Sequence, residues 1–241
     1  MYKPPGEARA FVEELAARLE KEDPSAEVIV APPFVSIHAA AEAARGTTIR
    51  VAAQNVHWED QGAFTGEVSG GMLRESGCTH VIIGHSERRQ FFGETDETVN
   101  KRIAAAFRHG LIPIFCLGET LGEREDGRTF DVIKRQLTVG MAGIRPPDPE
   151  RFMIAYEPVW AIGTGKTATP EQAQEVHAFL REKIGSLVDM DFAQRMRLLY
   201  GGSVKPDNTR GLVTRPDIDG GLVGGACLKI DEFMGIIGQV T

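Results

Sequence analysis

Short apolar segments alternate with longer amphipathic segments along most of the chain. Residues Glu7 to Lys21 place apolar side chains at spacings of three and four, which predicts an amphipathic helix. Residues Glu27 to Ala31 then form a continuous apolar run of strand length. The further predicted strands are 48–53, 79–84, 111–117, 151–156, 197–200 and 218–223, and the further predicted helices are 35–44, 71–75, 96–109, 123–139, 171–184, 206–212 and 230–237.

This alternation predicts an α/β fold with parallel strands joined by right-handed crossovers. A doubly wound open sheet would want a Gly-x-Gly-x-x-Gly after its first strand, which this sequence lacks, so a (β/α)8 barrel is favoured. Such a barrel needs eight strands, but the pattern predicts seven. The missing first strand should precede the helix at Glu7, where Met1 to Gly6 remain.

Composition narrows the class of protein. A chain of 241 residues is long enough for one large core, so we expect residues 1–241 to form a single domain. A net charge of -7 argues against a nucleic-acid partner, and the absence of a long apolar run argues against a membrane span or signal peptide. We therefore expect a cytoplasmic protein. The three scattered cysteines have no metal-type spacing and are expected to be reduced, buried thiols.

Polar and glycine-rich positions follow several predicted strands. In a barrel of this type the active site lies at the carboxyl ends of the strands, where His85, Glu157, Ser203 and Gly224-Gly225 fall. Two glycine pairs, at Gly201-Gly202 and at Gly224-Gly225, could be tight turns. Their place after the last two strands favours a phosphate site built from backbone N–H groups.

Glu157 ends an apolar run, and Pro158 stops the strand because it cannot donate a ladder hydrogen bond. A lone glutamate is usually a solvated loop acid, and a histidine after a strand is often structural. A glycine-rich loop follows Glu157, and closure of such a loop would exclude water and raise the basicity of the carboxylate. With His85 at the same mouth and no metal or dinucleotide motif, the pattern favours cofactor-free proton transfer in a small phosphorylated carbonyl compound.

Two stretches carry a family resemblance. Ala155-Tyr156-Glu157-Pro158-Val159-Trp160-Ala161-Ile162-Gly163-Thr164-Gly165-Lys166 and Gly84-His85-Ser86-Glu87-Arg88-Arg89 resemble the triosephosphate isomerase family. Tyr200-Gly201-Gly202-Ser203-Val204 and Leu222-Val223-Gly224-Gly225-Ala226 agree with it. The resemblance runs from about Pro4 to the C-terminus.

The resemblance implies a (β/α)8 TIM barrel and an isomerase of glycolysis and gluconeogenesis. Glu157 would move a proton between neighbouring carbons of dihydroxyacetone phosphate to give glyceraldehyde 3-phosphate, and a neutral His85 would polarise the carbonyl oxygens. These two roles are those established for the family. The backbone amides of Gly163, Ser203, Gly224 and Gly225 would hold the phosphate, Glu87 would support the site, and residues 158–167 would form a closing lid.

The resemblance also implies partners. The segment Phe64-Thr65-Gly66 resembles the loop that enters a neighbouring subunit in the family, so a homodimer is expected. The expected ligand is a small phosphorylated triose, with no cofactor and no metal.

The chain departs from the family at its beginning. The family's first strand carries Asn-x-Lys, and by alignment Met1 falls immediately after that lysine, so the sequence is expected to be N-terminally truncated relative to the family. Lys3 falls beyond the motif, and Lys166 is expected to be solvated. Three interpretations stay open: an ordinary isomerase whose start lies upstream of Met1, a catalytically crippled isomerase-like protein, and a barrel that serves as a scaffold.

Overall fold

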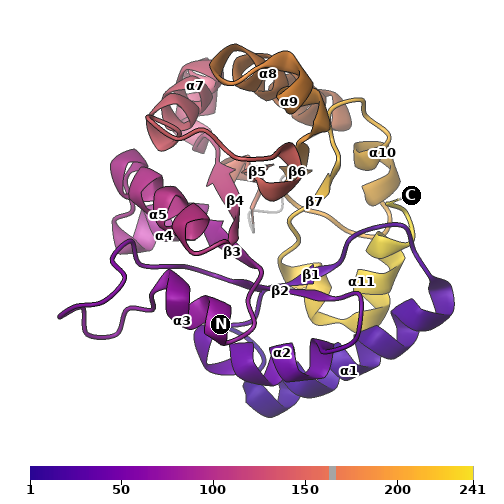
Figure 1. The fold of residues 1–241 in the computed structure, drawn as a ribbon. Coiled ribbons are helices and arrows are strands. Elements are labelled where there is room, and N and C mark those ends of the chain that lie inside the picture. The colour runs from indigo at the N-terminus through magenta and orange to yellow at the C-terminus, as the bar shows by residue number, and fades with distance from the viewer. Residues whose placement is uncertain (163–166, 241) are drawn as a thin grey trace.

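A curled sheet of seven parallel strands forms the centre of the molecule. The computed structural model describes residues 1–162 and 167–240. Each strand pairs with the next one along the chain, in the order β1 to β7, and the helices lie outside the sheet (Figure 1). The strands are β1 (Ile29–Val30), β2 (Arg50–Ala53), β3 (His80–Ile83), β4 (Ile112–Leu117), β5 (Met153–Tyr156), β6 (Arg197–Tyr200) and β7 (Gly220–Gly221).

Amphipathic helices follow the strands, as the periodicity predicts. The α-helices are α1 (Pro5–Glu22), α2 (Ile37–Ala44), α3 (Gly70–Glu75), α4 (Ser86–Phe92), α5 (Asp96–Arg108), α6 (Leu121–Glu125), α7 (Thr129–Gly140), α8 (Pro170–Leu187), α9 (Met190–Arg195), α10 (Thr209–Val213) and α11 (Ile230–Ile237). Short 3-10 turns are η1 (Phe34–Ser36), η2 (Pro149–Arg151), η3 (Val159–Ala161) and η4 (Gly225–Leu228).

Strands β3 and β5 are buried on both faces. Along β5, Met153 and Ala155 belong to a small cluster inside the curled sheet, whereas Ile154 and Tyr156 belong to the larger cluster between the sheet and the helices. This alternation follows from the two-residue period of a strand. It explains why the strand segments are continuously apolar in sequence.

The seven predicted strands are confirmed. Among the described residues, β1 pairs with β2 and β7 pairs with β6, and no ladder joins β1 to β7. Side chains of the inner cluster beside these two edges, Ile29, Ala31, Leu199 and Leu222, are partly exposed. The sheet therefore has two free edges in the described part of the chain.

The helices differ from the predicted elements in two respects. The helix expected at 123–139 is two helices, because Gly127 adopts a φ of +71° between α6 and α7, in the left-handed region that interrupts a helix. Two short helices, α4 and α9, were not predicted; α4 begins inside the polar segment after β3. The start of α8 is as predicted, with Thr169 and Gln172 forming a capping box around Pro170 at the first turn.

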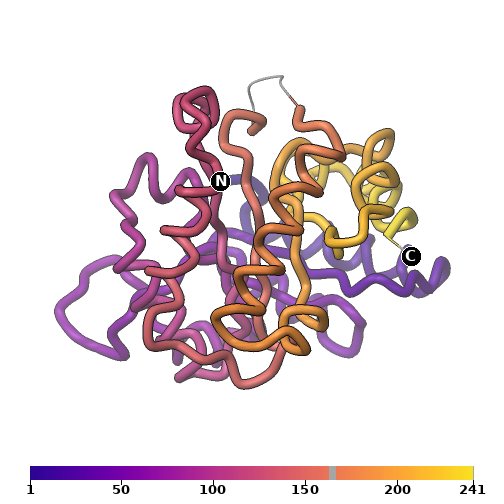
Figure 2. Tube along the Cα trace, turned by 90° about the horizontal axis from the view of Figure 1, so that it is seen from above, coloured from indigo at the N-terminus to yellow at the C-terminus, as the bar shows by residue number. Residues whose placement is uncertain are grey.

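Residues 57–67, which connect β2 to α3, project from the body of the molecule in both views (Figures 1 and 2). Phe64 lies on this projection with 43 % of its surface exposed, and its ring centroid is 4.4 Å from that of His57. Of the cysteines, Cys78 and Cys116 are buried free thiols, as expected, whereas Cys227 is partly exposed.

Candidate active site

Glu157 follows the last residue of β5 and is 1 % exposed. Its backbone N–H continues the ladder to Leu117 with a bond of 2.8 Å. Ser86 holds its carboxylate from two sides, because the Ser86 backbone N–H donates to Oε2 at 2.9 Å and the Ser86 hydroxyl donates to Oε1 at 3.3 Å. A buried carboxylate with hydrogen-bond donors of this kind has a fixed direction, which a proton acceptor requires.

His85 lies at the N-cap of α4, directly after β3 and Gly84. Gly84 has a φ of +75°, so the turn that presents the histidine favours glycine. The Glu87 backbone N–H donates to Nδ1 of His85 at 3.2 Å, and Nε2 lies 3.0 Å from Oε1 of Glu157. Because Nδ1 accepts, the neutral ring carries its proton on Nε2, which faces Glu157.

The pKa of His85 reflects two opposing effects. Burial lowers it, because the charged ring loses hydration, while the hydrogen bond and the negative charge of Glu157 raise it, with smaller contributions from Glu87 and Glu94. The net direction is upward from the ordinary value of 6.5. The backbone N–H of Glu87 on Nδ1 opposes protonation of the ring, since a protonated Nδ1 could not accept that bond.

The candidate phosphate residues occupy the carboxyl ends of β6 and β7. Ser203 is partly exposed, and its carbonyl accepts a bond of 2.9 Å from the side chain of Asn208. Gly224 and Gly225 are exposed, and a Cβ built on either would meet no atom within 4 Å. Their backbone is therefore open to approach by a ligand. Gly163 lies outside the described residues.

The side chain of Glu87, the predicted supporting residue, and the lysines Lys3 and Lys166 were considered from the sequence as charged groups near the site. The Glu87 side chain is 69 % exposed, and its Oε2 lies 4.0 Å from Nδ1 of His85. Lys3 places its Nζ 4.4 Å from the ring centroid of Phe11 on α1. Lys166 is not among the described residues. Within the described part of the chain, the cationic group paired with Glu157 within 4.0 Å is His85, if its ring is protonated.

Two residues at the site carry contacts that the sequence reasoning did not assign. The sequence marks Ser86 only as part of a motif, yet it donates twice to Glu157. Glu119, fully buried, accepts from the Tyr156 hydroxyl at 3.1 Å and from the Trp160 indole N–H at 2.9 Å. The position of Glu119 directly after β4 could have marked it as a site residue, since the carboxyl ends of the strands meet at the site.

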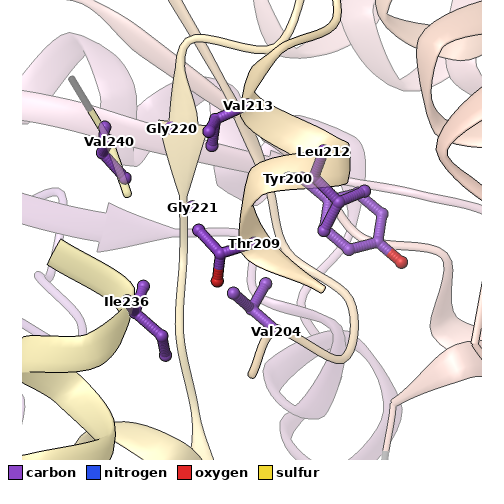
Figure 3. A pocket seen from close by; sticks show the side chains of 9 residues that line it. All are labelled: Tyr200, Val204, Thr209, Leu212, Val213, Gly220, Gly221, Ile236 and Val240. Atoms are coloured by element: carbon purple, nitrogen blue, oxygen red, sulfur yellow. The ribbon is translucent and has the colours of Figure 1, made fainter. Parts of the chain in front are cut away.

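A small hollow has a lining that includes neither His85 nor Glu157. It is bounded by β6, β7, α10 and α11, and its lining is mostly apolar (Figure 3). The Tyr200 hydroxyl points away from the other labelled side chains. A volume of about 10 Å³ matches one water molecule, so this hollow cannot hold a phosphorylated triose.

Across 1–162 and 167–240, no three histidine, cysteine, aspartate or glutamate side chains form a group that could hold a metal ion. Among the helices that the structure describes, none combines the length and the apolar character needed to cross a membrane.

Comparison with known proteins identifies the family. The family model for triosephosphate isomerase matches residues 1–240. The chain is 54 % identical to a triosephosphate isomerase of Geobacter metallireducens and 55 % identical to one of Geotalea uraniireducens, each over 237 residues that cover 98 % of this chain and 94 % of the relative. It is 54 % identical to that of Acetivibrio thermocellus over 97 % of this chain and 92 % of the relative. The geometry at the ends of β3 and β5 and these matches agree, and the chain belongs to the triosephosphate isomerase family.

Proposed function

We propose that Glu157 is the base that interconverts dihydroxyacetone phosphate and glyceraldehyde 3-phosphate, in the cytoplasm and as a step of glycolysis. The observation that carries this proposal is the 3.0 Å contact between Glu157 Oε1 and His85 Nε2 at a buried strand end. In the structure the Nε2–H of His85 faces the carboxylate. With substrate bound, the same N–H is the group that can donate to the carbonyl oxygen while the carboxylate takes the adjacent carbon-bound proton.

In the proposed reaction, protons move only between the substrate and the side chains of Glu157 and His85. Glu157 removes a proton from the carbon that bears the hydroxyl, which leaves an enediolate, and returns a proton to the neighbouring carbon. The neutral imidazole of His85 stabilises the developing oxyanion and moves a proton between the two oxygens. A base and a neutral histidine are the roles established for this family.

Replacing Glu157 tests this assignment. Glu157→Gln keeps the size of the side chain but removes the base, so kcat in a coupled assay should fall by about 10²- to 10⁴-fold in both directions. Glu20→Gln on α1 is the matched control, since the same chemical change at an exposed side chain away from the site should alter kcat by less than about twofold. A Glu157→Gln protein with kcat within tenfold of the parent would contradict the assignment.

The phosphate is assigned to the backbone amides of Ser203, Gly224 and Gly225, together with Gly163. A net charge of -7 makes long-range attraction of an anion unfavourable, so capture must be local. The open space around Gly225 supports this assignment, because a methyl group there meets nothing in the free protein. Gly225→Ala should therefore raise KM and weaken competitive inhibition by inorganic phosphate without lowering Tm.

Gly6→Ala is a suitable control, because a methyl group at Gly6 also meets nothing within 4 Å and lies on α1. An unchanged KM in Gly225→Ala would refute the phosphate assignment. A protein that binds phosphate but shows no isomerisation would instead support the crippled isomerase-like alternative.

We also propose a homodimer formed through Phe64-Thr65-Gly66. Phe64 lies on the projecting segment, and Met72, Phe91 and Phe92 add large exposed apolar side chains on α3 and α4, with exposed fractions of 56, 67 and 68 %. Exposed apolar side chains in such number are typical of a protein contact. Phe64→Asp should convert the dimer to a monomer in sedimentation analysis. A parent protein that sediments as a monomer at micromolar concentration would contradict the proposal.

A further inference from the structure

The side chain of Gln136, on α7, pairs with the backbone of Gly118. The Gly118 N–H donates to Oε1 of Gln136 at 2.8 Å, and Nε2 of Gln136 donates to the Gly118 carbonyl at 3.1 Å. Gln136 is 6 % exposed, and Gly118 is buried. The amide thus satisfies both backbone groups of the first residue beyond β4, as a neighbouring strand would.

Gly118 lies directly against the backbone of Glu157. A Cβ built on Gly118 would be 1.7 Å from the Glu157 carbonyl oxygen. The residues on either side of Gly118 bond to the same segment, because the Glu157 N–H donates to Leu117 and the Val159 N–H donates to Glu119 at 3.1 Å. The position of Gly118 therefore constrains the position of the Glu157 backbone.

The side chain after Gly118 adds a second set of contacts. The carboxylate of Glu119 accepts from the hydroxyl of Tyr156 and the indole of Trp160, which flank Glu157 in sequence. Residues 117–119 consequently hold residues 156–160 through both backbone and side-chain bonds. Gln136 is the side chain from outside this pair of segments that fixes the Gly118 backbone on both its donor and its acceptor.

We propose that Gln136 is a positioning residue for the isomerase reaction, acting on Glu157 through Gly118; this rests on the proposed role of Glu157 as the base. Gln136 has no contact with His85, Glu157 or the candidate phosphate residues among the interactions of the described chain. Its loss should therefore misplace the base without removing any group that binds substrate. A displacement of about 1 Å at a reacting group lowers the rate by about 10²-fold, so the effect falls on kcat and spares KM.

A glutamine that only packs α7 against the sheet would behave differently. Its removal would lower the stability of the fold, but the folded fraction would turn over substrate at the parent rate. The separation of kcat from stability is thus the decisive measurement.

The matched control is Asn100 on α5. Its side-chain amide donates at 2.9 Å to the carbonyls of both Gly140 and Ala142, at the C-terminal end of α7. Asn100→Leu and Gln136→Met each remove an amide that makes two bonds to the backbone. Both variants should lower the urea midpoint, whereas kcat should fall by about 10- to 100-fold in Gln136→Met alone, with KM within about twofold of the parent.

A second variant, Gln136→Glu, provides a readout that packing would not change. An ionised carboxylate accepts from the Gly118 N–H but cannot donate to the Gly118 carbonyl, whereas a protonated carboxyl group does both. The ratio of kcat in Gln136→Glu to kcat in the parent should therefore rise as the pH falls. This variant also carries the test if Gln136→Met does not fold.

The outcomes separate the two proposals. If Glu157→Gln abolishes turnover but Gln136→Met keeps kcat within about twofold, the role of Gln136 is overturned and the base assignment stands. A Gln136→Glu ratio that stays flat with pH also overturns it. If Glu157→Gln itself retains turnover, the base assignment fails first.

Discussion

A methyl group at Gly118 should misplace Glu157, the proposed catalytic base. In Gly118→Ala the new Cβ would lie 1.7 Å from the Glu157 carbonyl oxygen, whereas real Cβ atoms essentially never approach closer than 3.0 Å. The two segments must therefore separate by about 1.3 Å, the difference between these distances. Since a displacement of about 1 Å can lower a rate by about 10²-fold, kcat should fall by about that factor.

The backbone at Gly118 adds no strain of its own, because its φ is not among the positive values. The measurement is kcat in a coupled isomerase assay, with the folded fraction taken from circular dichroism at the same temperature. Overpacking of this kind also lowers the free energy of unfolding by about 1–3 kcal/mol, so assays should be made well below Tm.

Alanine substitutions at two further glycines give kcat values with which Gly118→Ala can be compared. Gly122 lies on α6, and a methyl group there meets nothing within 4 Å, so Gly122→Ala should leave kcat unchanged and stabilise the helix by up to about 1 kcal/mol. At Gly201 a methyl group would be 2.9 Å from Cγ of Glu157, so Gly201→Ala should have a smaller effect than Gly118→Ala. A Gly118→Ala protein with kcat equal to that of Gly122→Ala would refute the steric argument.

The contacts of His85 and Tyr156 lead to further predictions. The pKa of His85, followed by NMR, should fall in Glu157→Gln, because the hydrogen bond and charge of Glu157 raise it; an unchanged pKa would contradict the contact. Since that pKa is raised on folding, the stabilisation from the pair is complete below pH 6.5 and is lost as the pH rises through the raised value, which urea titrations at several pH values would show. Tyr156→Phe removes a buried donor to Glu119 and should lower the free energy of unfolding by about 1–3 kcal/mol, measured by urea denaturation.

Much of the fold is predictable because hydrophobic period and chain order are local properties of the sequence. The two-residue period of β5 and the capping box at Thr169 each depend on residues that are close together in sequence, and both are confirmed. The break between α6 and α7 occurs at Gly127, whose φ lies in the left-handed region. The apolar periodicity continues on both sides of this glycine, so the sequence pattern does not show the break. Glycine within a helical pattern is ambiguous in sequence, so the two helices were predicted as one.

The candidate site was predictable to the level of which strand ends meet. His85 and Glu157 are brought together as the parallel topology requires. The bonds from Ser86 to the carboxylate and from Gln136 to Gly118 could not be predicted, because they join residues 71 and 18 positions apart through side-chain directions. Such contacts depend on rotamers and helix rotation, which hydrophobic patterning does not encode.

The order of the strands in the sheet is also the order in which a ribosome makes them. During synthesis each new strand finds its neighbour already present, so the sheet can grow by one βα unit at a time without long-range loop closure. The proposed base Glu157 and His85, which follow β5 and β3, emerge before Ser203, Gly224 and Gly225. In a nascent chain the proposed reactive residues are therefore made before the proposed phosphate-binding residues. The isomerase can bind its substrate only when its last βα units are complete.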